Sequence, residues 1–214
     1  GSAVAGSSLP LYSAKDKGAR PMFDGLVYLD NAAATRLDER VLETMKPYLF
    51  DTYAVATSQF GYSPGIEAKD ALDHARGKVA AAMGATPEEV IFTSGSTESS
   101  NLALKGVALA LGEKKGRHIV TTRLEDFPVL YSARSLERQG FEVTTLDVDE
   151  NGRIELDALR DSIRDDTILV SIQAANQEIG TLQDLEAAGV ICRERGTLLH
   201  SDATHSFPRV PLDV

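Results

Sequence analysis

The chain contains 214 residues, of which 43% are hydrophobic and 25% charged, so we expect an ordinary globular protein with a full hydrophobic core. Its formal net charge of −10 argues against nucleic acid or an anionic membrane as a main partner, and no apolar run is long enough to predict a membrane span. A single cysteine, Cys192, excludes an internal disulfide, which favours the cytoplasm as the compartment.

The composition and the hydrophobic periodicity of the chain change near residue 26. Residues 1–25 are rich in Gly, Ser, Pro and Lys and show little periodicity, so we predict an irregular N-terminal arm followed by one domain over 26–214. The apolar run at 27–29 predicts a short strand. Asp38 is placed to cap a helix whose apolar face carries Val41, Met45 and Leu49.

A longer helix is predicted from Ser63, with Pro64 at its first helical position and Gly84 at its end. The polar residues 86–89 then predict a turn. The apolar run at 90–93 that follows predicts a strand.

Beyond residue 97 the chain alternates regularly between helical and strand patterns. The predicted helices cover 97–111, 128–138, 156–163 and 182–195, and the predicted strands cover 118–121, 141–146, 167–172 and 197–200. Several of these strands are apolar at neighbouring positions and are joined by helical connections. This pattern predicts an α/β fold in which helices cover both faces of a mostly parallel sheet.

Polar segments follow the predicted strands, where open α/β sheets bind ligands. Between residues 93 and 97, a helix N-terminus and hydroxyl side chains are suited to an anion, although Ser96 or Thr97 would serve equally as a helix cap. Asp202 can pair with a ring nitrogen or a metal, or cap a turn. The segments 123–127 and 175–181 are further strand ends that either contact a ligand or satisfy loop backbone.

Several motifs together resemble one known family. In the family's order and spacing, the chain carries similar segments at 28–35, 92–98, 101–103, 164–171, 178–181 and 200–204. On these motifs residues 26–214 are similar to the cysteine desulfurases of aminotransferase class V, which have the pyridoxal-phosphate fold type I. The resemblance implies an incomplete large domain of that fold.

The resemblance also implies a cofactor and its contacts. Pyridoxal 5'-phosphate is the cofactor of such enzymes, and no metal is implied. Ser96 and Thr97 would hold its phosphate, and Asp202 would pair with its pyridine nitrogen. Gln177 and His205 stand where the family has an Asn and a Gln that touch the ring substituents.

Other positions depart from the family pattern. Asp126 stands where the family has a His that stacks on the cofactor ring, and a carboxylate cannot stack. The last lysine is Lys115, so the Schiff-base lysine and the persulfide cysteine of the family, which come later in the chain, are both missing. Cys192 lies on a predicted helix, and we expect it to be a small core residue.

Three functions remain open on this basis. The first is sulfur removal from L-cysteine by a desulfurase half that is inactive alone and is completed by a complementary C-terminal polypeptide. The resemblance further implies a homo-oligomer such as a dimer, a sulfur-acceptor protein as partner, and a place in iron-sulfur metabolism. The second is a non-catalytic scaffold or interaction domain, and the third is another class V lyase or transaminase half. In the family, the strand matching 90–93 has later strands as neighbours, so we expect an unpaired edge here. A second polypeptide, a self-associated dimer or a local rearrangement would fill the gap.

Overall fold

The computed structural model describes residues 27–57 and 62–212. The predicted N-terminal arm at 1–25 lies outside the described residues. The chain divides into two units between Arg36 and Leu37, and the second unit contains every helix and strand named below.

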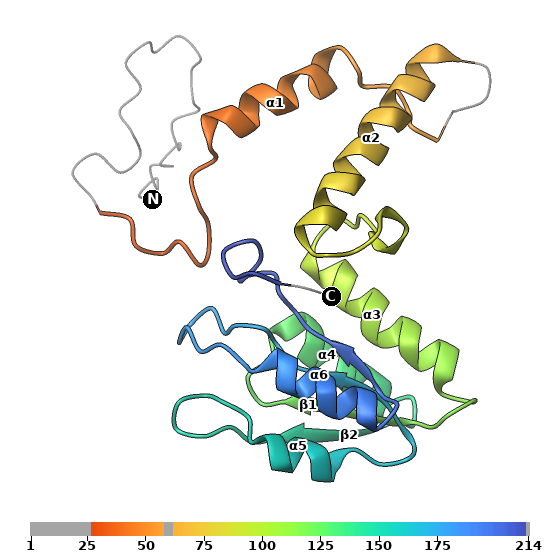
Figure 1. Ribbon diagram of the computed structural model, residues 1–214, viewed down its shortest axis with the longest axis vertical. Helices are drawn as coiled ribbons and strands as arrows, with labels where there is room; N and C mark the ends of the chain where they lie inside the picture. The colour runs from red at the N-terminus through yellow and green to blue at the C-terminus, as the bar shows by residue number, and fades with distance from the viewer. Residues whose placement is uncertain (1–26, 58–61, 213–214) are drawn as a thin grey trace, which may run out of the picture. The chain divides into compact units, whose positions relative to one another are not determined.

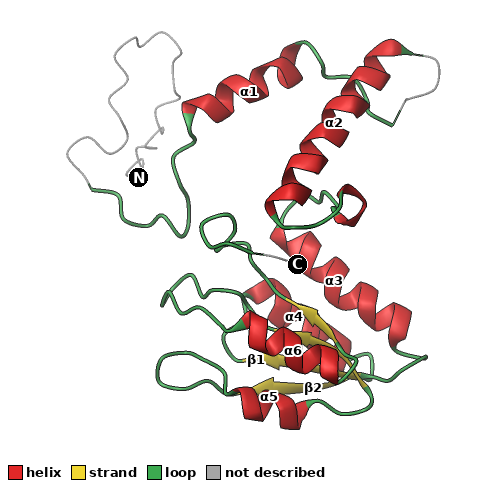
Figure 2. Ribbon diagram, viewed as in Figure 1, coloured by secondary structure: helices red, strands yellow, loops and turns green. Residues whose placement is uncertain are grey.

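A parallel sheet forms the centre of the second unit (Figure 2). Its four strands are β1 (His118–Thr122), β2 (Glu142–Leu146), β3 (Thr167–Ser171) and β4 (Leu198–His200), in the order β2-β1-β3-β4. Every residue of the two central strands is buried, whereas β2 and β4 carry exposed positions. The predicted α/β fold with a parallel sheet is confirmed.

Two pairs of helices cover the two faces of this sheet (Figure 1). They are α3 (Ser96–Leu111) with α4 (Phe127–Glu137), and α5 (Leu156–Ser162) with α6 (Leu185–Glu194). Because neighbouring strand residues point to opposite faces, Ile119 joins the core beneath α3 and α4 while Val120 joins the core that includes Cys192 of α6. The thiol of Cys192 is buried, and burial raises its pKa to about 11, as expected of a structural core residue.

Two further helices and a short 3-10 turn precede the sheet: α1 (Glu39–Phe50), α2 (Ser63–Ala82) and η1 (Pro87–Glu89). Asp38 caps α1 as predicted, since its Oδ1 accepts a hydrogen bond of 2.8 Å from the Arg40 amide. The cap of α2 is Tyr62, so Ser63, predicted to be the cap, is instead the first helical residue. Among the described helices, none has both the length and the apolar character required to cross a bilayer.

Two apolar runs predicted to be strands do not form strands. Residues 27–29 and 90–93 lie outside every strand of the described chain, and the side chains of Leu29 and Ile91 are 82% and 69% exposed. A strand needs a neighbour that satisfies its amide and carbonyl groups, and the described chain provides none for either run. For 90–93, the expectation that its neighbours come from elsewhere remains a prediction.

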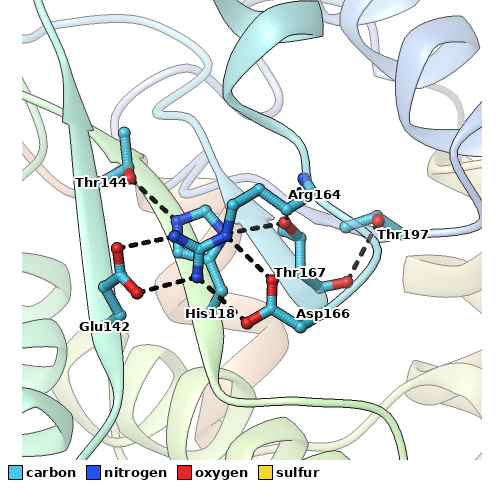
Figure 3. Close-up of polar contacts among 7 residues, drawn as sticks. All are labelled: His118, Glu142, Thr144, Arg164, Asp166, Thr167 and Thr197. Atoms are coloured by element: carbon cyan, nitrogen blue, oxygen red, sulfur yellow. Dashed lines mark hydrogen bonds and ion pairs between the residues drawn. The ribbon is translucent and has the colours of Figure 1, made fainter.

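A polar cluster joins the beginnings of the strands (Figure 3). The buried imidazole of His118 hydrogen-bonds the Thr167 hydroxyl through Nδ1 at 2.7 Å and the Thr144 hydroxyl through Nε2 at 2.8 Å. Arg164 pairs with Glu142 at 2.6 Å and with Asp166 at 2.9 Å. The cluster therefore ties β1, β2 and β3 together through side chains as well as through backbone hydrogen bonds.

We expect His118 to make stability depend on pH. Burial lowers the pKa of its imidazole below the usual value of 6.5, and the nearby charge of Arg164 lowers it further. The contribution of His118 to the free energy of unfolding is therefore fully present above pH 6.5. It is lost as the pH falls toward the lowered pKa of the folded state, because the unfolded chain takes up a proton first. Urea unfolding at several pH values should show a smaller acid loss for His118→Gln than for the natural chain. The exposed His74→Gln is the control, and an equal acid loss in all three proteins would contradict the expectation.

Candidate cofactor-binding site

A pocket of about 360 Å³ lies at the carboxyl edge of the sheet. It is lined by residues 91–93, 95, 96, 99, 100 and 200–204, so two segments that are far apart in the sequence form it. The first contains the N-terminus of α3, and the second follows β4. This is the edge at which open α/β sheets bind ligands, and the volume lies within the range of about 300–1,000 Å³ typical of small-molecule sites.

The N-terminus of α3 presents backbone donors to this pocket. The first intrahelical bond of α3 runs from the Ser99 amide to the Gly95 carbonyl at 3.0 Å, so the preceding amides have no acceptor within the helix. Gly95 is the N-cap and has φ 153° and ψ −176°, a conformation that is essentially restricted to glycine. Neither Ser96 nor Thr97 is the cap. The alternative that these hydroxyls merely cap the helix is therefore wrong.

The loop before α3 is held by its own side chains. The Glu98 carboxylate accepts hydrogen bonds from the Ser94 amide at 2.7 Å and the Ser94 hydroxyl at 2.6 Å, and these bonds hold the pKa of Glu98 below its usual value. The Thr93 hydroxyl lies 2.7 Å from the Ser99 hydroxyl. The loop is thus shaped before any ligand arrives.

Asp202 lines the pocket from the second segment and is only 5% exposed. Its Oδ1 accepts a hydrogen bond of 2.9 Å from the Thr204 amide, and its backbone carbonyl accepts one of 2.9 Å from the Ala174 amide. Its Oδ2 is buried and has no hydrogen-bond partner in the described part of the chain. A buried oxygen without a partner is costly, so this atom is suited to a donor supplied by a ligand.

His200 also lines the pocket and precedes Asp202 by two residues. Its Nδ1 lies 2.8 Å from the Ser171 hydroxyl, and burial lowers the pKa of its imidazole. A neutral imidazole in this position places no positive charge beside Asp202. The described residues contain no group of three His, Cys, Asp or Glu side chains arranged as metal ligands.

The remaining residues predicted for the site lie outside the pocket lining. Thr97 is exposed at the second position of α3, and Gln177 and His205 are half-buried in loops after β3 and β4. Gln177 Oε1 accepts a hydrogen bond of 2.8 Å from Gln173 Nε2. The structure thus brings Ser96 and Asp202 to one pocket, whereas Thr97, Gln177 and His205 do not line it.

Asp126, the residue in place of the family's stacking His, has a structural role. It is the N-cap of α4, where its Oδ1 accepts a hydrogen bond of 2.9 Å from the Phe127 amide. The neighbouring Phe127 ring stacks on Tyr131, with centroids 5.8 Å apart, and is 67% exposed. Neither side chain contributes to the lining of the pocket.

Glu125 is the residue near this site that the sequence did not single out. It is 5% exposed, and burial raises the pKa of its carboxyl to about 8. Glutamate is almost never fully buried without a partner, so its position in a polar segment after a strand gave no signal of burial. Its hydrogen bonds across to the segment after β3 become visible only in the tertiary structure.

Comparison with known proteins places the chain in a family. Residues 27–214 match the family model described as Aminotransferase class-V. The chain belongs to this family. Membership of the aminotransferase class-V family implies pyridoxal phosphate as the cofactor. Among its class V relatives, the cysteine desulfurase IscS of Neisseria meningitidis serogroup A / serotype 4A is 51% identical over 188 residues, which cover 88% of this chain and 46% of that protein.

Solved structures share the fold of this chain. A NifS-like protein superposes with a TM-score of 0.83 at 40% identity, over 88% of this chain and 51% of that one. A structure of SspA in complex with cysteine superposes with a TM-score of 0.82 at 37% identity, over 87% of this chain and 53% of that one. The chain thus spans about half the length of the relatives it matches.

Proposed function

We propose that this chain provides the cofactor-binding half of a cysteine desulfurase that binds pyridoxal phosphate and removes sulfur from L-cysteine. The observation that carries the proposal is the meeting of the α3 N-terminus and the unpartnered Asp202 oxygen in one pocket. The domain concerned is residues 26–214. A cytoplasmic location agrees with the single, buried cysteine.

The phosphate of the cofactor would lie against α3. The helix N-terminus offers backbone amides and a partial positive charge, which together favour an anion. Ser96 would add a hydroxyl donor from the pocket lining, and Thr97 would add a second from the next position. Glu98 stays clear of the anion, because its carboxylate is engaged by Ser94.

Asp202 would hold the ring of the cofactor. Its Oδ2 is an acceptor that needs a donor, and a protonated pyridine nitrogen is a donor of matching charge. The carboxylate would keep that nitrogen protonated, while the Thr204 amide fixes the orientation of the carboxylate through Oδ1. Bound pyridoxal phosphate supplies an electron sink for bond cleavage at the substrate carbon atoms. Gln177 and His205 would contact the ring substituents from the two adjacent loops.

A complementary polypeptide would complete the enzyme. It would supply the lysine that bears the cofactor and the cysteine that takes up sulfur, leaving alanine and an enzyme persulfide. Exposed apolar side chains offer it a surface: Val41, Met45 and Leu49 of α1 are 46%, 45% and 57% exposed, and Leu198 at the edge strand β4 is 50% exposed. A second copy of the chain and a sulfur-acceptor protein are further partners that we propose, along with a place in iron-sulfur metabolism.

The proposal is tested first by cofactor binding. We expect the purified chain to bind pyridoxal phosphate, detected as a change in its visible absorption, and Asp202→Asn to weaken this binding about tenfold or more, because a charge-assisted hydrogen bond is lost. The asparagine keeps Oδ1 as acceptor for the Thr204 amide, so the loop should persist. Asp161→Asn on the exposed surface of α5 is the control. Failure of the natural chain to bind would overturn the proposal.

Activity is the second measurement of the same test. Alone, the chain should release no alanine or sulfide from L-cysteine. Mixed with the polypeptide that corresponds to the remaining half of its IscS relative, it should release both products. Asp202→Asn should abolish this activity of the mixture. Cofactor binding without any gain of activity would instead favour another class V lyase or transaminase.

A non-catalytic interaction domain is the second candidate function, and Asp126 favours it. The position of the stacking His holds a carboxylate that caps α4. A chain that binds neither pyridoxal phosphate nor its analogues, yet binds the complementary polypeptide, would support this candidate.

A further inference from the structure

Glu125 is a buried carboxyl group that none of the roles described above uses. It lies between β1 and α4 and is 5% exposed. Its Oε1 accepts hydrogen bonds from the Thr122 hydroxyl at 2.9 Å and from the Gln173 amide at 2.8 Å. Its Oε2 is buried without a partner in the described part of the chain.

These bonds connect Glu125 to the segment that flanks the pocket. The Gln173 amide donates to Glu125, and the next amide, that of Ala174, donates to the backbone carbonyl of Asp202 at 2.9 Å. The side chain of Gln173 continues outward, since its Nε2 donates to Gln177 Oε1 at 2.8 Å. The beginning of the loop after β3 is thus held by Glu125 on one side and by Asp202 on the other.

The charge around Glu125 favours its uncharged form. Burial raises the pKa of its carboxyl to about 8, and the neighbouring carboxylates of Asp202 and Asp126 raise it further, against the lowering effect of its two hydrogen bonds. The Thr122 hydroxyl and Gln173 amide are neutral donors, so neither brings a compensating positive charge.

We propose that Glu125 is a positioning residue that, through its hydrogen bonds to the Thr122 hydroxyl and the Gln173 amide, fixes residues 173–177 beside the pocket that Asp202 lines. The positioning role stands on the hydrogen bonds of Glu125 alone. Its consequence for a bound ring rests on the proposed function.

The test that needs no ligand follows the Gln173 amide by NMR from pH 6 to pH 9.5. In the natural chain its resonance should titrate with a midpoint near 8, because the acceptor of its hydrogen bond ionises there. Glu125→Gln keeps Oε1 but cannot ionise, so the titration should vanish while hydrogen exchange of the amide stays slow. Glu125→Asp is one methylene shorter and should speed that exchange about two- to tenfold, as expected for one lost hydrogen bond. The exposed Glu186→Gln on α6 is the control.

Unfolding provides a second readout of the same group. The native state keeps the Glu125 proton up to about pH 8, whereas the unfolded chain releases it near 4.5. The contribution of Glu125 to the free energy of unfolding is therefore fully present below about pH 4.5 and is lost as the pH rises toward about 8. The urea midpoint of the natural chain should fall with pH relative to that of Glu125→Gln. Identical slopes, together with a Gln173 amide that does not titrate, would overturn the proposal.

The ligand readout separates this inference from the proposed function. At pH 7, Glu125→Asp should weaken the binding of pyridoxal phosphate about two- to tenfold relative to the natural chain. Glu125→Gln should bind it as tightly as the natural chain does. Weakening by Glu125→Gln as large as that by Glu125→Asp would overturn the positioning role, because the glutamine keeps both the side-chain length and the accepting Oε1. If the natural chain binds no pyridoxal phosphate, the proposed function fails, while the amide titration still decides the role of Glu125.

Discussion

Leu104→Ala is expected to destabilise the chain by about 2–5 kcal/mol, whereas Leu109→Ala on the same helix should change stability by less than about 0.5 kcal/mol. Leu104 is completely buried and lies in the core between α3 and the sheet, together with Ile119 and Leu169. Its truncation removes apolar contacts and leaves a cavity that the surrounding side chains fill only in part. Leu109 is 81% exposed, so its truncation removes little that folding had buried.

The two leucine variants are compared by urea unfolding at one pH and one protein concentration. Both carry the same chemical change in the same helix, so helix propensity cancels and burial alone separates them. Equal losses of stability in the two variants would contradict the packing of α3 against the sheet.

Gly95→Ala is expected to cost about 1–3 kcal/mol and to weaken ligand binding at the α3 N-terminus. The cost comes from the backbone, because φ at Gly95 is 153° and a Cβ added there would meet nothing within 4 Å. Relief of this strain would rotate the peptide groups that lead into the helix, which moves the amides that face the pocket. Stability and affinity should therefore fall together.

Gly106→Ala is the matched control for this variant. Gly106 lies inside α3, where an added Cβ also meets nothing within 4 Å, and alanine in a helix interior should stabilise by about 0.5–1 kcal/mol. Thermal unfolding and a titration with pyridoxal phosphate measure both effects. A Gly95→Ala chain that is as stable as the Gly106→Ala chain would contradict the conformation assigned to Gly95.

Local patterns identified most of the elements. The four strands of the sheet and the four helices that cover it lie where hydrophobic periodicity predicts them, with shifts of a few residues at their ends. Helix α6, for example, begins at Leu185 behind the Asp184 cap, whereas the pattern predicted a start at 182. The order of apolar and polar residues at 182–184 fits the helical pattern that follows. Leu182 nevertheless forms an isolated bridge with Ala175 and stays outside the helix. A bridge within the loop before α6 thus overrides the helical preference at that boundary.

The candidate site was predictable in part. Ser96 and Asp202 were expected at a common ligand, and both line one pocket. The sequence left open whether the Ser96 hydroxyl is a helix cap, because a cap is decided by the backbone angles of Gly95 and not by residue type. It also assigned Asp126 only by its place in a motif, and its use as the cap of α4 emerged from the fold.

By itself the sequence determined the fold class, the family resemblance and the strand ends at which polar residues gather, because these follow from short-range periodicity and from motifs. The tertiary structure decided the features that depend on contacts between residues far apart in the sequence. Residues 90–93 have the composition of a strand yet form none, since a strand exists only beside a partner that satisfies its backbone. Likewise, the pKa of Glu125 is raised because the fold buries its carboxyl and brings it near Asp202, which is remote in the sequence.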